Sequence, residues 1–219
     1  MKYPAVYSYK LSKTRELELS IETLKNIDCW NGEVYVVGDK PDFDGNYTHL
    51  PIKYDWGKKV HNRHQDEWCA YITAAEATDR FILMSDDIFI LMPYTPKWYN
   101  RGELLDQQNS RRLRFDDYSQ QLAHTNKWLR SMEASTLSFE LHIPYVVQSS
   151  HVIQAAEIIP NGNQVAFIRS VLGNLYEKTA GEAKDSKNID PENAIVYSSD
   201  NFTFNYERIK AIYERNRIL

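Results

Sequence analysis

The sequence predicts an α/β fold in which a mostly parallel sheet is flanked by helices. Over the first ninety residues, short apolar runs and helical patterns follow in the order strand, helix, strand, strand, helix, strand. Such alternation is typical of parallel sheets, because a crossover helix returns the chain to the same edge. A chain of 219 residues with 13% aromatic side chains also suits one domain that buries a sizeable core.

The elements can be placed from apolar spacing and turn residues. Ser12 or Thr14 is expected to cap the first helix. The expected elements are a strand at 5–9, a helix at 14–26, strands at 33–37 and 48–54, a helix at 65–77, a strand at 81–84 and an apolar run at 88–92.

The second half of the chain is more polar. Residues 95–135 favour helices, and we interpret them as a subregion over the open face of the same domain. Residues 178–193 carry few apolar side chains and predict a loop. The other expected elements are a strand at 139–148, a short helix or strand at 151–159, a helix at 163–176, a strand followed by a polar turn at 194–204 and a helix at 206–215.

Composition excludes several classes of protein. A net charge of −4 gives no overall basic field for nucleic acid. Cys29 and Cys69 have no metal-like spacing and indicate a reducing compartment. No signal-peptide pattern or long apolar stretch is present, which predicts a cytoplasmic protein without a membrane span. The sequence contains no P-loop, Gly-x-Ser-x-Gly or Gly-x-Gly-x-x-Gly pattern. It therefore does not have the pattern of a kinase, a hydrolase or a dehydrogenase.

Two adjacent carboxylates follow a buried strand. Asp86 and Asp87 lie between the apolar runs 81–84 and 88–91. Ionised carboxylates beside buried apolar residues need compensation, and a divalent cation with its preference for oxygen ligands supplies it. Tyr9 ends the expected strand at 5–9, and Asp39 follows the expected strand at 33–37. Both residues are therefore expected at the carboxyl edge of the sheet, together with Asp86 and Asp87. The alternative is that the two aspartates only cap a turn.

The segment FILMSDDIFIL resembles the DXD segment of GT-A glycosyltransferases, with Ser85 in place of the first acid. The order of features is also similar to that of Stealth-type sugar-phosphate transferases: a helix at 16–24, a strand at 34–38, the acidic strand end and a His-x-Pro element at 142–144. Residues 5–9 match the first Stealth signature only in part, which favours glycosyl transfer over sugar-phosphate transfer. The resemblance implies one GT-A-like, Rossmann-like catalytic domain over residues 1–219, with 95–135 on the acceptor side.

The same resemblance implies a metal-dependent glycosyltransferase that uses a nucleotide-sugar donor and Mn²⁺ or Mg²⁺. By this resemblance Asp87 binds the metal and Asp86 faces the donor sugar or ribose. A further metal ligand is expected from His142 or, as a second choice, Asp200. The alternative for His142 is a strand histidine bonded to backbone groups, and for Asp200 an Asx-turn.

Other residues are candidates for donor and acceptor contacts. Asp39 is expected to accept a hydrogen bond from the base or ribose, and Arg63 to bind the diphosphate; a turn cap and a solvated helix entrance are the alternatives. If transfer inverts the anomeric centre, Glu140 is the first choice of base, on the same strand face as His142, with a surface carboxylate as the alternative.

One basic cluster remains for the acceptor. Arg111, Arg112 and Arg114 could track a polyanion such as a polyol-phosphate polymer or modified nucleic acid, or simply form a solvated face. A glycan acceptor is equally open. A Stealth-like sugar-phosphate transferase and a non-catalytic binding module are the other functions that fit the sequence.

Overall fold

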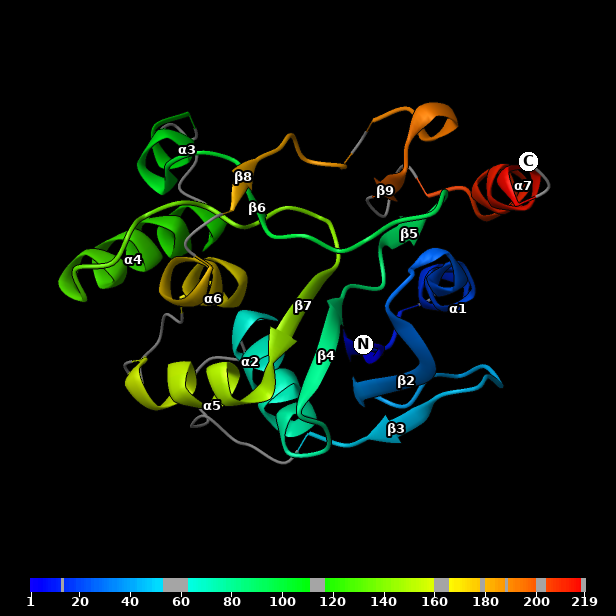
Figure 1. Ribbon diagram of the computed structural model, residues 1–219, viewed down its shortest axis with the longest axis horizontal. Helices are drawn as coiled ribbons and strands as arrows, with labels where there is room; N and C mark the ends of the chain where they lie inside the picture. Colours follow the sequence, from blue (N-terminus) through cyan, green and yellow to red (C-terminus); the bar gives the residue numbers. More distant parts are fainter. Residues whose placement is uncertain are drawn as a thin grey trace.

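The computed structural model describes residues 1–12, 14–52, 63–110, 117–159, 166–177, 180–187, 189–199 and 204–217. Its centre is a five-stranded sheet with the strand order β3-β2-β1-β4-β7 (Figure 1). The strands are β1 (Tyr3–Tyr9), β2 (Trp30–Gly38), β3 (Thr48–Leu50), β4 (Arg80–Met84) and β7 (Tyr145–Gln148). All neighbouring strands are parallel except β7, which is antiparallel to β4. The predicted α/β fold with a mostly parallel sheet is therefore confirmed.

Helices cover both faces of this sheet. Figure 1 shows α2, α5 and α6 on one side and α1 on the other. The helices are α1 (Glu16–Thr23), α2 (Arg63–Ala75), α3 (Leu104–Ser110), α4 (Asp117–Ser131), α5 (Ser149–Ile158), α6 (Ile168–Tyr176) and α7 (Tyr206–Asn216), with the 3₁₀ turns η1 (Leu24–Asn26) and η2 (Pro191–Asn193). Two small sheets join β5 (Ile88–Ile90) to β9 (Val196–Ser198) and β6 (Tyr99–Asn100) to β8 (Gly181–Glu182).

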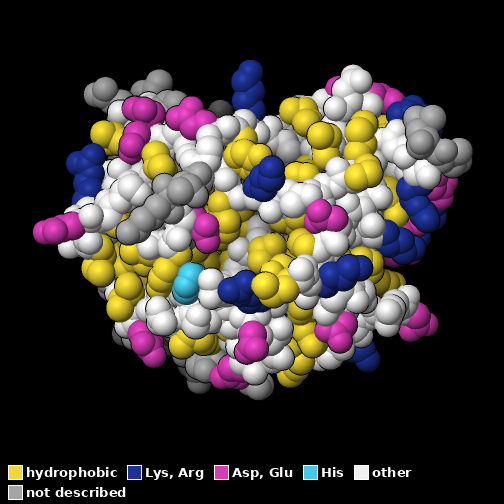
Figure 2. Space-filling view, viewed as in Figure 1, with side chains coloured by type: hydrophobic (Ala, Val, Ile, Leu, Met, Phe, Trp, Pro, Cys, Tyr) yellow, Lys and Arg dark blue, Asp and Glu magenta, His cyan; other side chains and the backbone are white. Residues whose placement is uncertain are grey.

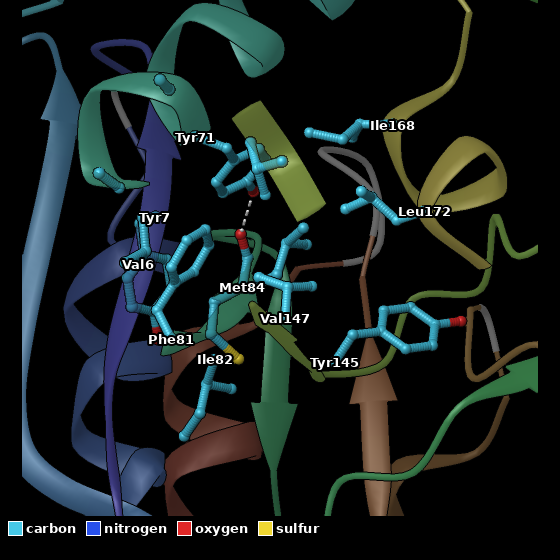
Figure 3. Close-up of a cluster of buried hydrophobic side chains, with 14 of the residues drawn as sticks. Val6, Tyr7, Tyr71, Phe81, Ile82, Met84, Tyr145, Val147, Ile168 and Leu172 are labelled. Carbon is cyan, nitrogen blue, oxygen red and sulfur yellow. Dashed lines mark hydrogen bonds between the residues drawn. The ribbon is translucent and has the colours of Figure 1, made fainter. Parts of the chain in front are cut away.

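The core lies between β1, β4, β7 and the helices. Tyr7 is fully buried, and its hydroxyl hydrogen-bonds to Ser20 Oγ of α1 at 2.9 Å. On the α2 side, the Tyr71 hydroxyl donates to the Met84 carbonyl at 2.8 Å (Figure 3). This bond satisfies a buried phenol and ties α2 to the last residue of β4. The end of β4 is thereby fixed from the helix layer.

Three expectations about local structure are wrong. The strand predicted at 139–148 begins only at Tyr145, because Pro144 has no N–H to donate to a ladder and restricts the residue before it. Glu140 and His142 therefore do not share a strand face. Helix α1 begins after Arg15 without a side-chain cap, and Thr14 instead donates to Glu16 Oε2.

The polar subregion is helical in part. Its described residues form the short strand β6, followed by α3 and α4, and α4 packs against α3 and α6. The subregion thus contacts the helical layer on the α6 side. Its role on the acceptor side stays a prediction.

The described helices include none that is both long and apolar enough to cross a membrane. On the face shown in Figure 2, basic and acidic side chains are interspersed.

Gly38 ends β2 and is paired with Tyr9, the last residue of β1. Its φ is +121°, and a Cβ there would lie 2.3 Å from the Tyr9 carbonyl oxygen. We expect Gly38→Ala to lower the free energy of unfolding by about 3 kcal/mol or more, from backbone strain and overlap together. Gly32→Ala is the matched control, because its φ is +96° but nothing lies within 4 Å, so it loses only about 1–2 kcal/mol. Urea unfolding followed by tryptophan fluorescence measures both, and equal losses would contradict the predicted overlap.

Candidate functional site

A cavity of about 880 Å³ lies at the carboxyl ends of β1, β2 and β4. The ends of the three strands contribute Tyr9, Gly38 and Ser85 to its wall, and α2 closes it with Asp66, Glu67 and Tyr71. This volume is within the range of small-molecule sites, about 300–1,000 Å³. The position is the one where open parallel sheets bind ligands, beside the point at which the strand order reverses, here between β1 and β4.

Four of the residues predicted from sequence line this cavity: Tyr9, Asp39, Asp86 and Asp87. Asp39 Oδ2 accepts a hydrogen bond from the Leu11 backbone N–H at 2.9 Å, which holds the loop after β1 against the end of β2. Tyr9 is buried, and burial is the largest cause that raises the pKa of its phenol. Nearby carboxylates, including Asp86, raise this pKa further. The convergence of these strand ends gives one polar wall at the sheet edge.

The turn between β4 and β5 fixes Asp87. Ile88 N–H donates to the Ser85 carbonyl at 3.2 Å, and β5 then pairs with β9. The Ser198 hydroxyl of β9 donates to Asp87 Oδ2 at 3.2 Å, and Ser199 N–H donates to the Asp87 carbonyl at 3.2 Å. The other carboxylate oxygen, Oδ1, is buried and has no hydrogen-bond partner among the described residues. A buried anionic oxygen in this state favours binding of a cation.

A lysine ammonium connects Asp87 to His142. Lys187 Nζ lies 3.7 Å from Asp87 Oδ2 and 3.4 Å from His142 Nε2. His142 Nδ1 lies 3.0 Å from Asp185 Oδ1, and the His142 backbone N–H donates to the same oxygen at 3.0 Å. Because the carboxylate can only accept, Nδ1 carries the proton and Nε2 presents its lone pair.

The charge state of Asp185 supports this assignment. Burial acts to raise the pKa of Asp185, but the side-chain and backbone hydrogen bonds from His142, together with the nearby Arg101, outweigh burial and lower the pKa to about 2. Asp185 is therefore ionised at neutral pH and orients the imidazole. Carboxylates back metal-binding histidines in the same way.

Asp87 and His142 fit a shared divalent cation by the chemistry of their donors. Asp87 offers an unpartnered buried oxygen, and His142 offers an Nε2 lone pair backed by Asp185. In the part of the chain that is described, no three Asp, Glu, His or Cys side chains form a metal-binding group. Mg²⁺-type sites commonly use one or two carboxylates and complete their coordination with substrate phosphates and water. Asp87 is consistent with that kind of site, with His142 as an added nitrogen ligand.

Arg169 interacts with both Ser85 and Glu140. Arg169 Nη2 of α6 donates to Ser85 Oγ at 2.6 Å, and this bond anchors the acidic turn, residues 85–87. Burial acts to lower the pKa of the Arg169 guanidinium. The charge of Glu140 and of other nearby groups outweighs burial, so the pKa of Arg169 is raised. Glu140 Oε1 accepts hydrogen bonds from Ser170 N–H at 3.0 Å and Ser170 Oγ at 2.9 Å. Burial raises the pKa of Glu140 despite Arg169.

Glu140 is not among the described residues that line the cavity. Its hydrogen bonds join the segment before β7 to the first turn of α6. These contacts give it a structural role, and its role as a catalytic base stays a prediction.

Several predicted residues lie outside the described structure. These are Asp200, the side chain of Arg63, and Arg111, Arg112 and Arg114. Their predicted roles at the metal, the diphosphate and the acceptor stay predictions.

Sequence reasoning missed four residues of this network: Lys187, Asp185, Arg169 and Ser198. Arg169 carries a signal in hindsight, because a lone arginine in the apolar run AFIRSVLGNL is unusual for a helix that packs on the core. Lys187 and Asp185 lie in a polar segment with no such signal. Their contribution depends on contacts with residues some 40 to 100 positions away.

The chain matches no known family model, and no curated protein sequence matches it.

Proposed function

We propose that this protein transfers a sugar from a nucleotide-sugar donor to an acceptor hydroxyl, as a GT-A-like glycosyltransferase. The observation that carries the proposal is the placement of Asp86 and Asp87 directly after β4, in a cavity that they share with Tyr9 and Asp39. Adjacent carboxylates at the carboxyl end of a parallel strand suit a cation that bridges protein and diphosphate.

The donor is oriented along the strand ends. The base or ribose lies toward Asp39 and Tyr9, at the ends of β2 and β1. Asp86 accepts a hydrogen bond from the sugar or ribose hydroxyls, and the diphosphate lies toward Asp87. Arg63, at the start of α2, is proposed to bind phosphate oxygens through its planar fork.

Transfer exchanges one C–O bond for another. The bond between the anomeric carbon and the diphosphate oxygen breaks, and its electron pair leaves with that oxygen. The acceptor hydroxyl oxygen forms the new bond to the anomeric carbon and loses its proton to a cavity carboxylate or to water. Because negative charge grows on the leaving diphosphate, positive charge beside Asp87 lowers the barrier.

Asp87 and His142 are the residues that would hold the cation. Bound Mn²⁺ or Mg²⁺ supplies the charge that stabilises the departing diphosphate. Asp185 keeps His142 in the tautomer that can coordinate, and Ser198 orients the Asp87 carboxylate.

We place the reaction in the cytoplasm, consistent with the two free thiols of Cys29 and Cys69. The acceptor is proposed to be a glycan, a polyol-phosphate polymer or a modified nucleic acid, with Arg111, Arg112 and Arg114 as the candidate contact for a polyanion.

The test is calorimetry with a panel of uridine, guanosine, cytidine and thymidine nucleotide sugars, each with Mn²⁺. We expect one base class to bind with a dissociation constant below the millimolar range and to be consumed when acceptors are added. A product that gains phosphorus would instead identify a sugar-phosphate transferase. If no nucleotide sugar binds at millimolar concentration, the proposal is wrong and a non-catalytic binding role is favoured.

A further inference from the structure

The position between Asp87 and His142 is already filled by a positive charge of the chain itself. Lys187 Nζ is within 3.7 Å of Asp87 Oδ2 and 3.4 Å of His142 Nε2, so it contacts both side chains that would hold a divalent cation. The histidine presents a lone pair to the ammonium, because its Nδ1–H is donated to Asp185. The ammonium therefore lies between the two side chains that would bind the metal.

We propose that Lys187 is an internal cation that competes with the divalent metal for Asp87 and His142. In this arrangement the ammonium holds the two ligands together before substrate arrives, and the metal must displace it to bind. The inference rests on the proposed function for the nature of the substrate, but the competition itself is a property of the metal site alone.

Local charge explains why an internal cation is needed. Among the described residues that line the cavity there are six carboxylates and two lysines. Glu16 is buried close to Asp87, since its Oε1 accepts from Ser199 Oγ, the residue next to the serine that binds Asp87. Without a positive charge, these carboxylates would repel one another in a partly desolvated site.

Backbone contacts fix Lys187, whereas its side chain is partly exposed and can change its conformation. Its backbone bridges to Ser198 of β9, and its N–H donates to Asp185 Oδ1 at 3.4 Å. Its side chain is 32% exposed and lines the cavity. A flexible four-carbon stem lets the ammonium leave Asp87 and reach the phosphate oxygens of a bound donor. Lys187 thus changes partner and stays in the same cavity.

The competition predicts that removing the ammonium strengthens metal binding. We expect Lys187→Met to lower the dissociation constant for Mn²⁺ alone about tenfold, because a competing ion pair and a like charge both disappear. Free Mn²⁺ measured by electron paramagnetic resonance gives this constant without any nucleotide. Lys10→Met is the matched control, since Lys10 lines the same cavity and its loss changes the charge equally. We expect it to change the constant less than threefold.

Two further measurements locate the effect. In the double variant Lys187→Met with Asp87→Asn, the gain in Mn²⁺ affinity should be lost. Urea unfolding of each variant verifies that it folds, which the partial exposure of Lys187 favours. An unchanged or weaker Mn²⁺ affinity in Lys187→Met, or an equal gain in Lys10→Met, would overturn the competition.

Nucleoside diphosphates separate this inference from the proposed function. If Lys187→Met gains Mn²⁺ affinity but neither protein binds uridine, guanosine, cytidine or thymidine diphosphate, the competition stands and the glycosyltransferase proposal fails. If the wild-type chain binds a diphosphate equally well in EDTA and Lys187→Met does not, the ammonium replaces the metal outright. That result would overturn both the competition and the proposed role of the metal, and would leave only the transfer from a nucleotide sugar in place.

Discussion

Replacing Asp87 by Asn is expected to reduce sugar transfer by at least about a hundredfold, because the ligand that holds positive charge beside the leaving diphosphate is lost. The amide keeps the shape of the carboxylate, so its carbonyl oxygen can still accept from Ser198. The fold should lose little stability, since the buried Oδ1 has no described partner to lose and the ion pair with the partly exposed Lys187 is weak. Release of nucleoside diphosphate from the donor found in the ligand screen measures the loss.

Asp66→Asn is the matched control for Asp87→Asn. Asp66 lies on α2 and lines the same cavity, so its substitution changes the cavity charge by the same amount. We expect turnover within about threefold of the wild type. Near-normal turnover of Asp87→Asn, or an equal loss in both variants, would contradict a specific role for Asp87.

The second large effect is expected at Arg169 and Glu140. Arg169→Met should lower the free energy of unfolding by about 2–4 kcal/mol, because it leaves the enclosed carboxylate of Glu140 without its counter-charge. It also removes the 2.6 Å bond to Ser85 that anchors the acidic turn. Glu140→Gln should lose less, about 2 kcal/mol, since the amide oxygen can still accept from Ser170.

A double-mutant cycle separates a structural pair from a catalytic base. If the two residues act on each other, the double variant should lose clearly less stability than the sum of the single variants, measured by urea unfolding. Glu157→Gln, on the exposed face of α5, is the control and should stay within about 0.5 kcal/mol of the wild type. Full stability of Glu140→Gln together with abolished turnover would instead restore Glu140 as the base.

Most of the central sheet could be predicted from sequence because β1, β2 and β4 are marked locally, whereas the start of β7 was predicted wrongly. The apolar runs that became β1, β2 and β4 stand between helical patterns and turn residues, so their order and direction follow from simple rules. The carboxylates after β4 are marked in the same way. Their meeting with Tyr9 and Asp39 follows from the parallel arrangement.

The rest of the site could not be predicted because it depends on contacts between distant segments. The apolar run at 88–92 carries no signal of its partner, and β5 pairs with β9 in a separate ladder. The segment 178–193 predicts only a loop, yet it carries Asp185 and Lys187. Low apolar content correctly indicates that a segment adds little to the core, but it gives no information on where its charges point.

The bond between Ser198 and Asp87 joins residues 111 positions apart, and Lys187 reaches Asp87 across a similar length of chain. A chain still emerging from the ribosome would already contain every strand of the central sheet once β7 is made, but would lack both Lys187 and β9. Such a nascent chain could acquire its scaffold well before the contacts that orient Asp87 and His142 exist. Those contacts, from Ser198 and Asp185, would form only when the last quarter of the polypeptide docks, a built-in order between assembly and activity.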